Sequence, residues 1–514
     1  WPGQLDTIIS TITAFQSGKR IVILEVPPGG GKSGIAVAVS RLMGGKSTMY
    51  LTATKDLQAQ YAALAGLQLV MGRNNFPCLL FPQVSAEKGH CAAGLTCQYV
   101  KDDPGCGYFD QLRVAKASSE VVSNYAYWLP SANYHRSFSD QSLLVCDEAH
   151  LLPGQLSSFV EYRLPRNLVQ LHDGPEFVEG EVPEEEQRAE WAEWAGRTSA
   201  ILRPQLQAMK EKIVAADGGE RRRLLEESHR LRSNLASLGA MADHEREIVV
   251  SRDTNAYSFI FSPVWVDQFG EKMLGRHTQK MLLMSATIGD PEFLCKRLGF
   301  AYEDVAWIQV PSHFDKRRRP LYYYPVVRAS GREVDGTANL LAPVIARIMA
   351  RHEGQKGLIH TTSYSLARAL VSRLPPGRIR LHVSGESRQD LLTWFRESAE
   401  PLVLVSPSMT TGIDLPYDQC RFQIVAKLPF PDLSDPVIKA QRRTSAGKRL
   451  TVTMTALELA QAYGRGMRAA DDLCPTYLLD ANFGGWFLAA ARKDMPQWLK
   501  EAIVNIDPER GEEE

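Results

Sequence analysis

Short apolar runs recur along the chain, and segments with the spacing of helices lie between them. Alternation of this kind is typical of parallel β-sheets whose two faces are covered by helices. The runs that we interpret as strands lie at residues 21–26, 47–54, 142–147, 280–287, 356–363, 401–408 and 422–429. The pattern therefore predicts an α/β protein, and it favours two parallel sheets over one.

Residues 155–255 depart from this alternation. Their two long stretches, 184–214 and 220–247, are rich in charge and have helical spacing. We interpret the region as a helical insertion between strands of the first sheet. A solvated coiled-coil linker is the alternative, because charged helical faces are usually exposed to water.

The composition limits the classes of partner. The chain has 514 residues, and its 59 basic and 59 acidic side chains give a formal net charge of zero. Any binding to nucleic acid must therefore use a local basic groove. The apolar runs fall short of the roughly 20 residues that cross a bilayer, and the first residues lack a signal-peptide pattern. We expect a cytoplasmic protein without a membrane partner.

The stretch ILEVPPGGGKSG, residues 23–34, joins a buried strand to a helix through a loop of prolines and glycines. Such a loop directs backbone N–H groups and the positive end of the helix toward an anion. Lys32 can reach the β- and γ-phosphates of ATP, and Ser33 can bind Mg²⁺. Val26 stands where the strict phosphate-loop pattern has glycine, but the strand–loop–helix context supports the assignment. A purely structural turn would have no need of the Lys–Ser pair. The phosphate-binding residues would be Gly29, Gly30, Gly31, Lys32 and Ser33.

Two further motifs carry the charges that phosphoryl transfer needs. A second apolar run ends in Asp147 and Glu148, which we interpret as an Mg²⁺ ligand and a general base. In QAYGRGMR, residues 461–468, the side chains of Gln461, Arg465 and Arg468 fall on one helical face. A solvated face would explain the arginines alone. The need for cations from a second domain favours a role in stabilising the transferred phosphoryl group.

Four of the eight cysteines fall in one short region: Cys78, Cys91, Cys97 and Cys106. The paired C-x-x-C units of structural zinc sites do not occur among them, and a cytoplasmic location disfavours disulfides. Four thiolates suit an iron–sulfur cluster. Spacing alone leaves an iron–sulfur cluster, zinc and unligated thiols open.

Together these motifs resemble those of superfamily 2 helicases: the phosphate loop at 25–33, DEAH at 147–150, SAT at 285–287, TTGIDLP at 410–416 and QAYGRGMR at 461–468. A narrower resemblance, to the XPD/DinG group of iron–sulfur helicases, covers almost the whole chain outside the helical insertion. It is carried by PGQ at 2–4, YLTATKDLQAQY at 50–61, SNYAYWL at 123–129, GLIHTTSY at 357–364 and KLPFPDLSDP at 427–436.

The resemblance implies two RecA-like P-loop motor domains, an iron–sulfur domain and a helical arch. The implied boundaries are 1–71, 116–154 and 256–308 for the first motor domain, 72–115 for the iron–sulfur domain, 155–255 for the arch and 309–514 for the second motor domain. It further implies that the four cysteines hold a 4Fe-4S cluster and that Gln4 contacts adenine. Gly412 and Asp414 would couple nucleotide to nucleic acid, and Ser285 with Thr287 would link hydrolysis to domain movement.

The chain departs from the group at Trp1, which stands where an arginine often precedes the glutamine motif, and at three positions of the phosphate loop. Val26 and Pro28 replace a small residue and a threonine, and Ser33 replaces a threonine. Pro28 stiffens the loop and removes a hydroxyl group. Lys32 and the Ser33 hydroxyl remain, so we expect ATP hydrolysis to remain as well.

With no net charge, binding of single-stranded DNA would depend on stacking and on hydrogen bonds to phosphates. Candidate side chains stand at strand ends or in loops: Thr52, Thr54, Tyr125, Thr361, Ser363 and Tyr364. Each tyrosine could instead belong to a hydrophobic core.

The sequence thus predicts an ATP-dependent DNA helicase with ATP, Mg²⁺ and a 4Fe-4S cluster as cofactors. The resemblance implies 5′ to 3′ movement on single-stranded DNA, unwinding of tailed duplexes, and a cluster domain at the point of strand separation. Two alternatives remain: a translocase recruited to a repair or CRISPR-associated complex, and a binding module for single-stranded DNA whose ATPase is inactive.

Overall fold

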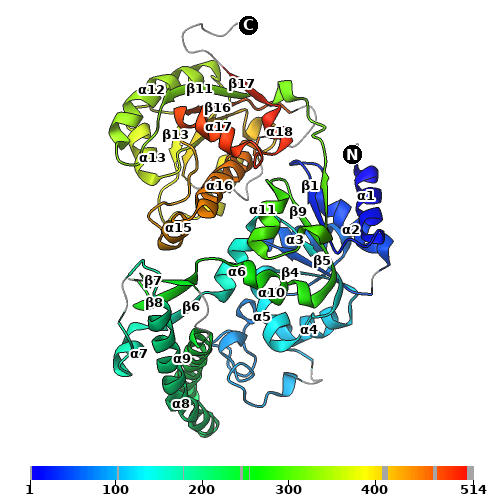
Figure 1. Ribbon diagram of the computed structural model, residues 1–514, viewed down its shortest axis with the longest axis vertical. Helices are drawn as coiled ribbons and strands as arrows, with labels where there is room; N and C mark the ends of the chain where they lie inside the picture. Colours follow the sequence, from blue (N-terminus) through cyan, green and yellow to red (C-terminus); the bar gives the residue numbers. More distant parts are fainter. Residues whose placement is uncertain are drawn as a thin grey trace.

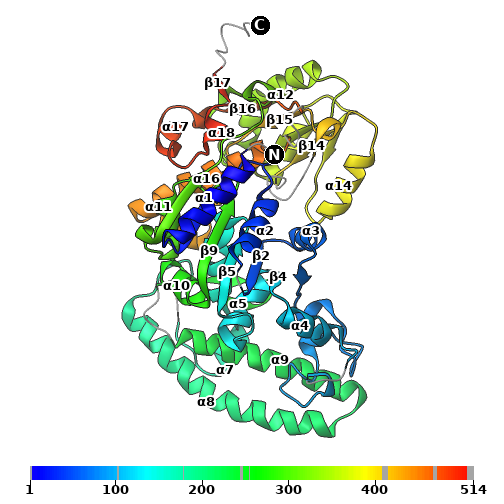
Figure 2. The same cartoon turned by 90° about the vertical axis from the view of Figure 1, so that its right-hand side faces the viewer.

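The computed structural model describes residues 3–44, 46–100, 104–176, 179–242, 247–253, 255–407, 415–466 and 472–505. Two α/β lobes lie one above the other along the long axis, and a pair of long helices lies at the far end of the first lobe (Figures 1 and 2). Each lobe contains a seven-stranded parallel sheet, which confirms the predicted α/β class with two sheets.

The first sheet has the strand order β10-β1-β9-β5-β2-β4-β3. Its strands are β1 (Ile21–Glu25), β2 (Thr48–Thr52), β3 (Gln68–Leu69), β4 (Glu120–Asn124), β5 (Gln141–Cys146), β9 (Thr278–Ser285) and β10 (Val305–Gln309). The helices of this lobe are α1 (Gln4–Gln16), α2 (Lys32–Met43), α3 (Lys55–Ala65), α4 (Gly107–Ala117), α5 (Tyr125–His135), α6 (Leu152–Val160), α10 (Gly270–Met273) and α11 (Pro291–Leu298).

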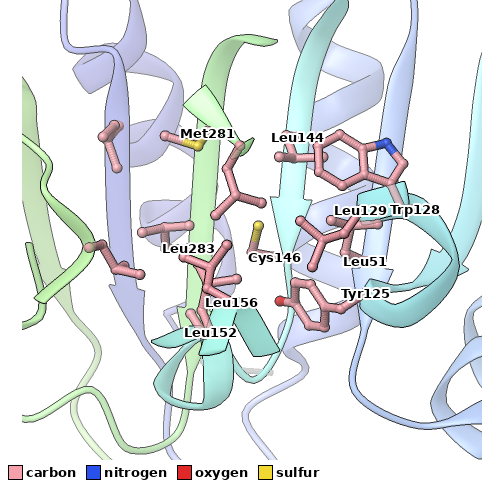
Figure 3. Packing of buried hydrophobic residues seen from close by; sticks show 14 of the residues in the cluster. Leu51, Tyr125, Trp128, Leu129, Leu144, Cys146, Leu152, Leu156, Met281 and Leu283 are labelled. Carbon is pink, nitrogen blue, oxygen red and sulfur yellow. The ribbon is translucent and has the colours of Figure 1, made fainter. Parts of the chain in front are cut away.

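Hydrophobic clusters cover both faces of this sheet, which explains why its strands are apolar throughout rather than alternating. β1 is buried at all of its positions and pairs with β9 on one side and β10 on the other. Figure 3 shows one face, where Trp128 and Leu129 of α5 pack with Leu144 and Met281 of the sheet. This packing holds the phosphate loop and the DEAH motif at the same edge of the sheet.

The second sheet has the order β13-β14-β12-β15-β16-β11-β17. Its strands are β11 (Leu321–Val327), β12 (Gly357–His360), β13 (Ile379–Leu381), β14 (Val403–Ser406), β15 (Phe422–Val425), β16 (Thr476–Asp480) and β17 (Ile503–Asn505). The helices around it are α12 (Val334–Arg351), α13 (Tyr364–Val371), α14 (Arg388–Glu397), α15 (Pro436–Gln441), α16 (Ser445–Tyr463), α17 (Trp486–Ala491) and α18 (Gln497–Lys500).

The region between the DEAH motif and β9 contains the two long helices, α8 (Glu185–Ala215) and α9 (Gly218–Met241), and a short helix α7 (Arg166–Leu171). It also contains a three-stranded antiparallel sheet that the sequence did not reveal: β6 (Tyr162–Pro165), β7 (Ile248–Asp253) and β8 (Ser258–Pro263). Trp191 and Trp194 of α8 pack against this sheet through Phe261. The helices therefore belong to a folded unit, and the interpretation as a solvated coiled-coil linker is wrong.

This small sheet also changes the boundaries that we predicted. A boundary at residue 256 separates β8 from its partner strands β6 and β7, and a boundary at residue 155 falls inside α6. The sequence could not show this, because β6 and β8 are paired across the two long helices that separate them along the chain.

The cysteine-bearing segment follows β3 and has few regular elements. Its own cluster is small, formed by Ala86, Cys106, Tyr108 and Phe109. A second contact joins it to the ends of α8 and α9, where Ala93 packs with Ile213 and Leu225 (Figure 2). Arg232 of α9 donates a hydrogen bond to the carbonyl of Ala93. The segment and the long helices thus support one another.

Trp128 gives a test of the first core. Its side chain is fully buried, and Nε1 donates to the carbonyl oxygen of Phe138 at 3.1 Å. We expect Trp128→Ala to lower the free energy of unfolding by about 3–5 kcal/mol, because the change leaves a large cavity. Tyr134→Ala, on the same helix but 70% exposed, should cost less than about 1 kcal/mol. Urea unfolding followed by circular dichroism checks both, and equal losses would contradict the packing.

Candidate active site

The loop between β1 and α2 is shaped to receive an anion. Gly29 and Gly31 adopt left-handed backbone angles, with φ of 74° and 78°, which favour glycine. A Cβ atom on Gly30 would lie 2.5 Å from the Val26 side chain, so only glycine fits there. The N-terminus of α2 has no side-chain cap, which leaves its first N–H groups and the positive end of the helix dipole for a ligand.

Gln4, at the start of α1, donates from Nε2 to the carbonyl of Gly30 at 3.2 Å. The residue thus lies against the phosphate loop. Its contact with adenine, which the resemblance implied, stays a prediction.

Asp147 lies at the end of β5 and is 3% exposed. The Tyr61 hydroxyl of α3 donates to Asp147 Oδ2 at 3.1 Å, and the backbone N–H of Glu148 donates to Oδ1 at 2.9 Å. Burial and the neighbouring charge of Glu148 raise the pKa of Asp147 to about 6, while the charge of Lys32 opposes the shift. A bound cation would stabilise the ionised form of this carboxylate, and Mg²⁺ prefers oxygen ligands of this kind. The position is therefore suited to Mg²⁺.

Tyr61 was not a sequence candidate, and its spacing gives no signal of this role. Its ring is fully buried, and burial together with the Asp147 charge raises the pKa of its hydroxyl well above the usual value. The Ser33 hydroxyl neighbours it and opposes that shift. Tyr61 therefore lies beside both predicted Mg²⁺ ligands, Ser33 and Asp147.

Glu148 occupies a left-handed backbone conformation with φ of 52°, which is uncommon for a residue other than glycine. Burial raises the pKa of Glu148, but the hydrogen bond from His150 and the charges of Lys32 and Arg465 outweigh it and hold the pKa below its usual range. The His150 Nδ1 atom lies 3.3 Å from Glu148 Oε2. Glu148 is thus an ionised carboxylate at neutral pH, as a base that orients water must be.

A chain of hydrogen bonds leads from Glu148 into the second lobe. Ser285 Oγ donates to Glu148 Oε2 at 3.3 Å, and the Thr287 N–H donates to Ser285 Oγ at 3.1 Å. Gln461 Nε2, at the end of α16, donates to Thr287 Oγ1 at 2.7 Å. Arg465 completes the chain with a 2.7 Å bond from Nη2 to Gln461 Oε1. Residues of three predicted motifs are therefore brought together. Arg468, Gly412 and Asp414 lie outside the described residues.

Trp498 of α18 is a second link between the lobes that the sequence did not suggest. Its Nε1 donates to the carbonyl of Ala286 at 3.0 Å, and its ring stacks on Tyr463 with centroids 5.6 Å apart. Together with Pro27 and Pro28 of the phosphate loop, these two rings line a small cavity. The departure at Pro28 thus adds apolar contact between the lobes.

The predicted nucleic-acid residues occupy equivalent places in the two lobes. Thr52 is the last residue of β2, and Thr361 directly follows β12. Both are fully buried and donate to the carbonyls of Thr54 and Ser363. Thr54 and Ser363 in turn cap the N-termini of α3 and α13. Tyr364 is partly exposed and contacts the His382 ring.

Tyr125 departs from its prediction. Its ring is fully buried in the core shown in Figure 3, and its hydroxyl donates to the carbonyl of Asp147 at 2.8 Å. A base needs an open aromatic face to stack on. Tyr125 supports the DEAH motif instead, and we do not retain it as a DNA contact.

Of the four predicted cluster ligands, Cys78 and Cys106 are buried, and Cys91 and Cys97 are half-buried. Within the described ranges, no group of three or more His, Cys, Asp or Glu side chains has the geometry of a bound metal ion. Burial raises the pKa of the Cys91 thiol; the charge of Arg73 opposes the shift, and Cys97, Cys78 and Cys106 add to it.

Arg73 supplies a second observation at the cysteines. Its Nε is buried without a hydrogen-bond partner, and its guanidinium lies over the Tyr108 ring at 5.0 Å. A buried cation with a spare donor is compatible with an anionic thiolate-bound cluster, because hydrogen bonds and charge around the sulfur atoms stabilise such clusters.

The chain is similar to known proteins in parts of its sequence. A model of the helicase C-terminal domain family matches residues 345–502. The ATP-dependent DNA helicase YoaA of Escherichia coli is 26% identical over 251 residues, which cover 46% of this chain and 39% of YoaA. The 3′-5′ exonuclease DinG of Bacillus subtilis is 22% identical over 324 residues, 57% of this chain and 34% of that protein. The chain thus spans about two fifths or less of these relatives.

Two solved structures share the fold over nearly the whole chain. An XPD helicase superposes with a TM-score of 0.65 at 15% identity, covering 98% of this chain and 99% of that one. Xpd4 of S. tokodaii gives 0.59 at 16% identity, with 99% and 100% covered. The chain therefore shares the two-lobed fold of these structures. Residues 345–502 thus match the helicase C-terminal domain family, and the chain is distantly similar to YoaA and DinG and shares the fold of XPD, in line with the resemblance that its motifs predicted.

Among the described helices, none is both long enough and apolar enough to cross a membrane.

Tyr61 gives a test of the metal side of the site. We expect Tyr61→Phe to weaken the apparent affinity for Mg²⁺ in ATP turnover by about tenfold, because partners that orient a metal ligand have effects of that size. Tyr302→Phe, whose ring is 40% exposed, serves as the control. The measurement is turnover against Mg²⁺ concentration at saturating ATP. An unchanged Mg²⁺ dependence would remove Tyr61 from the site.

Proposed function

We propose that this chain is an ATP-dependent DNA helicase that moves along single-stranded DNA and unwinds tailed duplexes. The observation that carries the proposal is the unbroken chain of hydrogen bonds from Glu148, through Ser285, Thr287 and Gln461, to Arg465. It connects the hydrolytic carboxylate of one lobe to a cation of the other. Such a connection suits a motor in which the binding and hydrolysis of the nucleotide control the relative position of the two domains.

In the proposed hydrolysis, the loop of Gly29, Gly30 and Gly31 cradles the phosphates of ATP with backbone N–H groups, and Lys32 neutralises the β- and γ-phosphates. Ser33 and Asp147 would hold Mg²⁺, which offsets charge on the phosphate oxygens when it is bound. Glu148, ionised and held by His150, accepts a hydrogen bond from the attacking water and aligns it with the γ-phosphorus.

Arg465 is the proposed source of positive charge from the second lobe, with Arg468 as its predicted companion. Arg465 is 8% exposed, and its bond to Gln461 fixes it toward the first lobe. A guanidinium that is already oriented stabilises charge on the transferred phosphoryl group at little cost in reorganisation. This arrangement favours an active ATPase over a binding module whose ATPase is inactive.

Single-stranded DNA would cross the edge where β2 and β12 end. Thr54 and Ser363 cap α3 and α13 there, and the helix N-termini offer backbone N–H groups and dipole ends to phosphates. Tyr364 is the remaining proposed aromatic contact. The family implies 5′ to 3′ travel, with two grips that tighten and release alternately as the lobes close on ATP and open after hydrolysis.

The four cysteines are proposed to hold a 4Fe-4S cluster whose role is structural, since phosphoryl transfer requires no electrons. The segment around them buries few apolar side chains of its own, so metal ligation would supply folding energy that packing does not. Its contact with α8 and α9 would then place the cluster segment and the long helices together beside the DNA, near the point of strand separation.

The test combines ATP turnover, with and without single-stranded DNA, and strand displacement from duplexes with 5′ or 3′ tails, on anaerobically purified protein. Stimulated turnover with displacement from the 5′ tail alone is the expected result. Stimulated turnover without displacement would instead indicate a translocase that works within a larger repair or CRISPR-associated complex. No turnover at all would contradict the enzyme.

Lys32→Ala should abolish ATP turnover, with a loss of roughly a hundredfold or more, because the charge on the transferred phosphates is no longer balanced. Binding of single-stranded DNA should persist, since the proposed DNA contacts lie on other elements. Fluorescence anisotropy with a labelled strand measures binding, and phosphate release measures turnover. Lys46→Ala, at an exposed position after α2, is the matched control. Normal turnover in Lys32→Ala would refute the phosphate-loop assignment.

Cys97→Ser should reduce bound iron from the roughly four atoms per chain of a complete cluster, because a hydroxyl is a poor substitute for a thiolate ligand. It should also reduce unwinding while leaving residual ATPase. Cys295→Ser, which changes a buried cysteine of α11, should retain wild-type iron. Iron analysis and the visible absorption of the cluster check both variants. Full iron occupancy in Cys97→Ser would exclude Cys97 as a ligand.

A further inference from the structure

Glu25 is a buried carboxylate that the proposed hydrolysis does not use. It is the last residue of β1 and the first of the 25–33 motif, ahead of the glycines that would bind phosphate, and it is 1% exposed. Both of its oxygens accept hydrogen bonds from amides: Ile288 N–H donates to Oε2 at 2.9 Å, and Gln309 Nε2 donates to Oε1 at 2.7 Å. The carboxylate therefore reaches two segments far along the chain.

The position of Glu25 explains why both partners are within reach. β1 lies between β9 and β10, and Glu25 is in register with Ser285 on one side and Gln309 on the other. Three segments leave the sheet at this point: the phosphate loop, the turn of residues 285–290, and the connection to the second lobe. Glu25 lies at the end of the sheet from which all three segments start.

The turn of residues 285–290 is the surface on which the second lobe rests. Ala286 accepts from Trp498, and Thr287 accepts from Gln461. Asp290 pairs with Arg449 at 2.5 Å, and its N–H donates to Asp494. Facing the other way, Ser285 bonds to Glu148 and the N–H of Ile288 bonds to Glu25. The turn is thus held between the first lobe and the second.

The chemistry of this carboxylate favours a role in fixing that turn. Burial raises the pKa of Glu25, while the bonds from Gln309, Ile288 and Gly289 and the charge of Lys500 oppose the shift. Burying a carboxylate costs free energy that an apolar side chain would not. What the carboxylate provides in return is an acceptor for the buried Ile288 N–H, which an apolar residue would leave unsatisfied.

We propose that Glu25 is a positioning residue that fixes the 285–290 turn against the phosphate-loop strand and so transmits the nucleotide state of the first lobe to the second. The carboxylate accepts its described hydrogen bonds from protein amides, so its removal should spare nucleotide binding and impair stimulation of turnover by DNA. The expected loss of DNA-stimulated turnover rests on the proposed function.

The experiment compares Glu25→Ala, Glu25→Gln and Gln309→Ala with the wild type. The readouts are the affinity for a fluorescent ATP analogue, turnover with and without single-stranded DNA, and amide hydrogen exchange of the peptide that covers residues 285–290. In Glu25→Ala we expect unchanged nucleotide affinity, faster exchange of the peptide and a loss of about tenfold in DNA-stimulated turnover, the size expected when a buried donor loses its acceptor.

The other variants separate the two bonds. Glu25→Gln keeps an oxygen that can accept from Ile288 and should restore both exchange and stimulation. Gln309→Ala removes an exposed side chain and leaves the bond from Ile288, so it should behave as the wild type. Glu25→Asp withdraws the acceptor but keeps the charge, and it should repeat the loss if Glu25→Ala does not fold.

Two outcomes would overturn the inference. One is wild-type exchange and stimulation in Glu25→Ala. The other is a parallel loss of nucleotide affinity, basal turnover and thermal stability, which would mark Glu25 as merely structural. If the wild type itself showed no stimulation by DNA, the proposed function would fail. The inference could still be decided, by comparing the amide hydrogen exchange of the 285–290 peptide in Glu25→Ala with that in Gln309→Ala.

Discussion

One buried hydrogen bond, from Gln461 Nε2 to Thr287 Oγ1, joins the two halves of this molecule at the place where their chemistry must meet. Each lobe has its own sheet and its own hydrophobic clusters on that sheet. What neither lobe has alone is a balanced set of charges. The first carries the two carboxylates and Lys32, and the second carries Arg465. The bond aligns these sets, and most of the proposed mechanism depends on that alignment.

A second constraint on the site is that two adjacent carboxyl groups must ionise differently. Asp147 and Glu148 are adjacent, and their environments move their pKa values in opposite directions: burial raises that of Asp147, and His150 with nearby cations lowers that of Glu148. Two neighbouring carboxyl groups can then take different roles, one as a metal ligand and one as a base. Tyr61, Tyr125 and Ser285 hold this arrangement from three different elements. The site is built by packing as much as by its motifs.

Features that depend on a local pattern of residues could be predicted from the sequence. β1, β5 and β9 were visible as apolar runs because parallel strands are buried on both faces. The strand and the helix expected on either side of the glycine loop are present despite Val26. Contacts between distant segments were not visible. β6 and β8 pair across two long helices, Trp498 reaches Ala286 from the end of the chain, and Glu25 resembled any strand residue. Tyr125 was misjudged because a tyrosine at the end of a strand can face a groove or the core, and only packing decides which.

The most direct test of the central claim is a double-mutant cycle on the bond between the lobes, with Thr287→Val, Gln461→Leu and the combined variant assayed for turnover stimulated by single-stranded DNA. If the hydrogen bond couples the two lobes, each single change should remove most of the stimulation, and the double variant should lose little more. That pattern corresponds to a coupling free energy of about 1 kcal/mol or more. Losses that simply add would show that the two residues act independently, and they would contradict this account of how hydrolysis in one lobe is linked to the other.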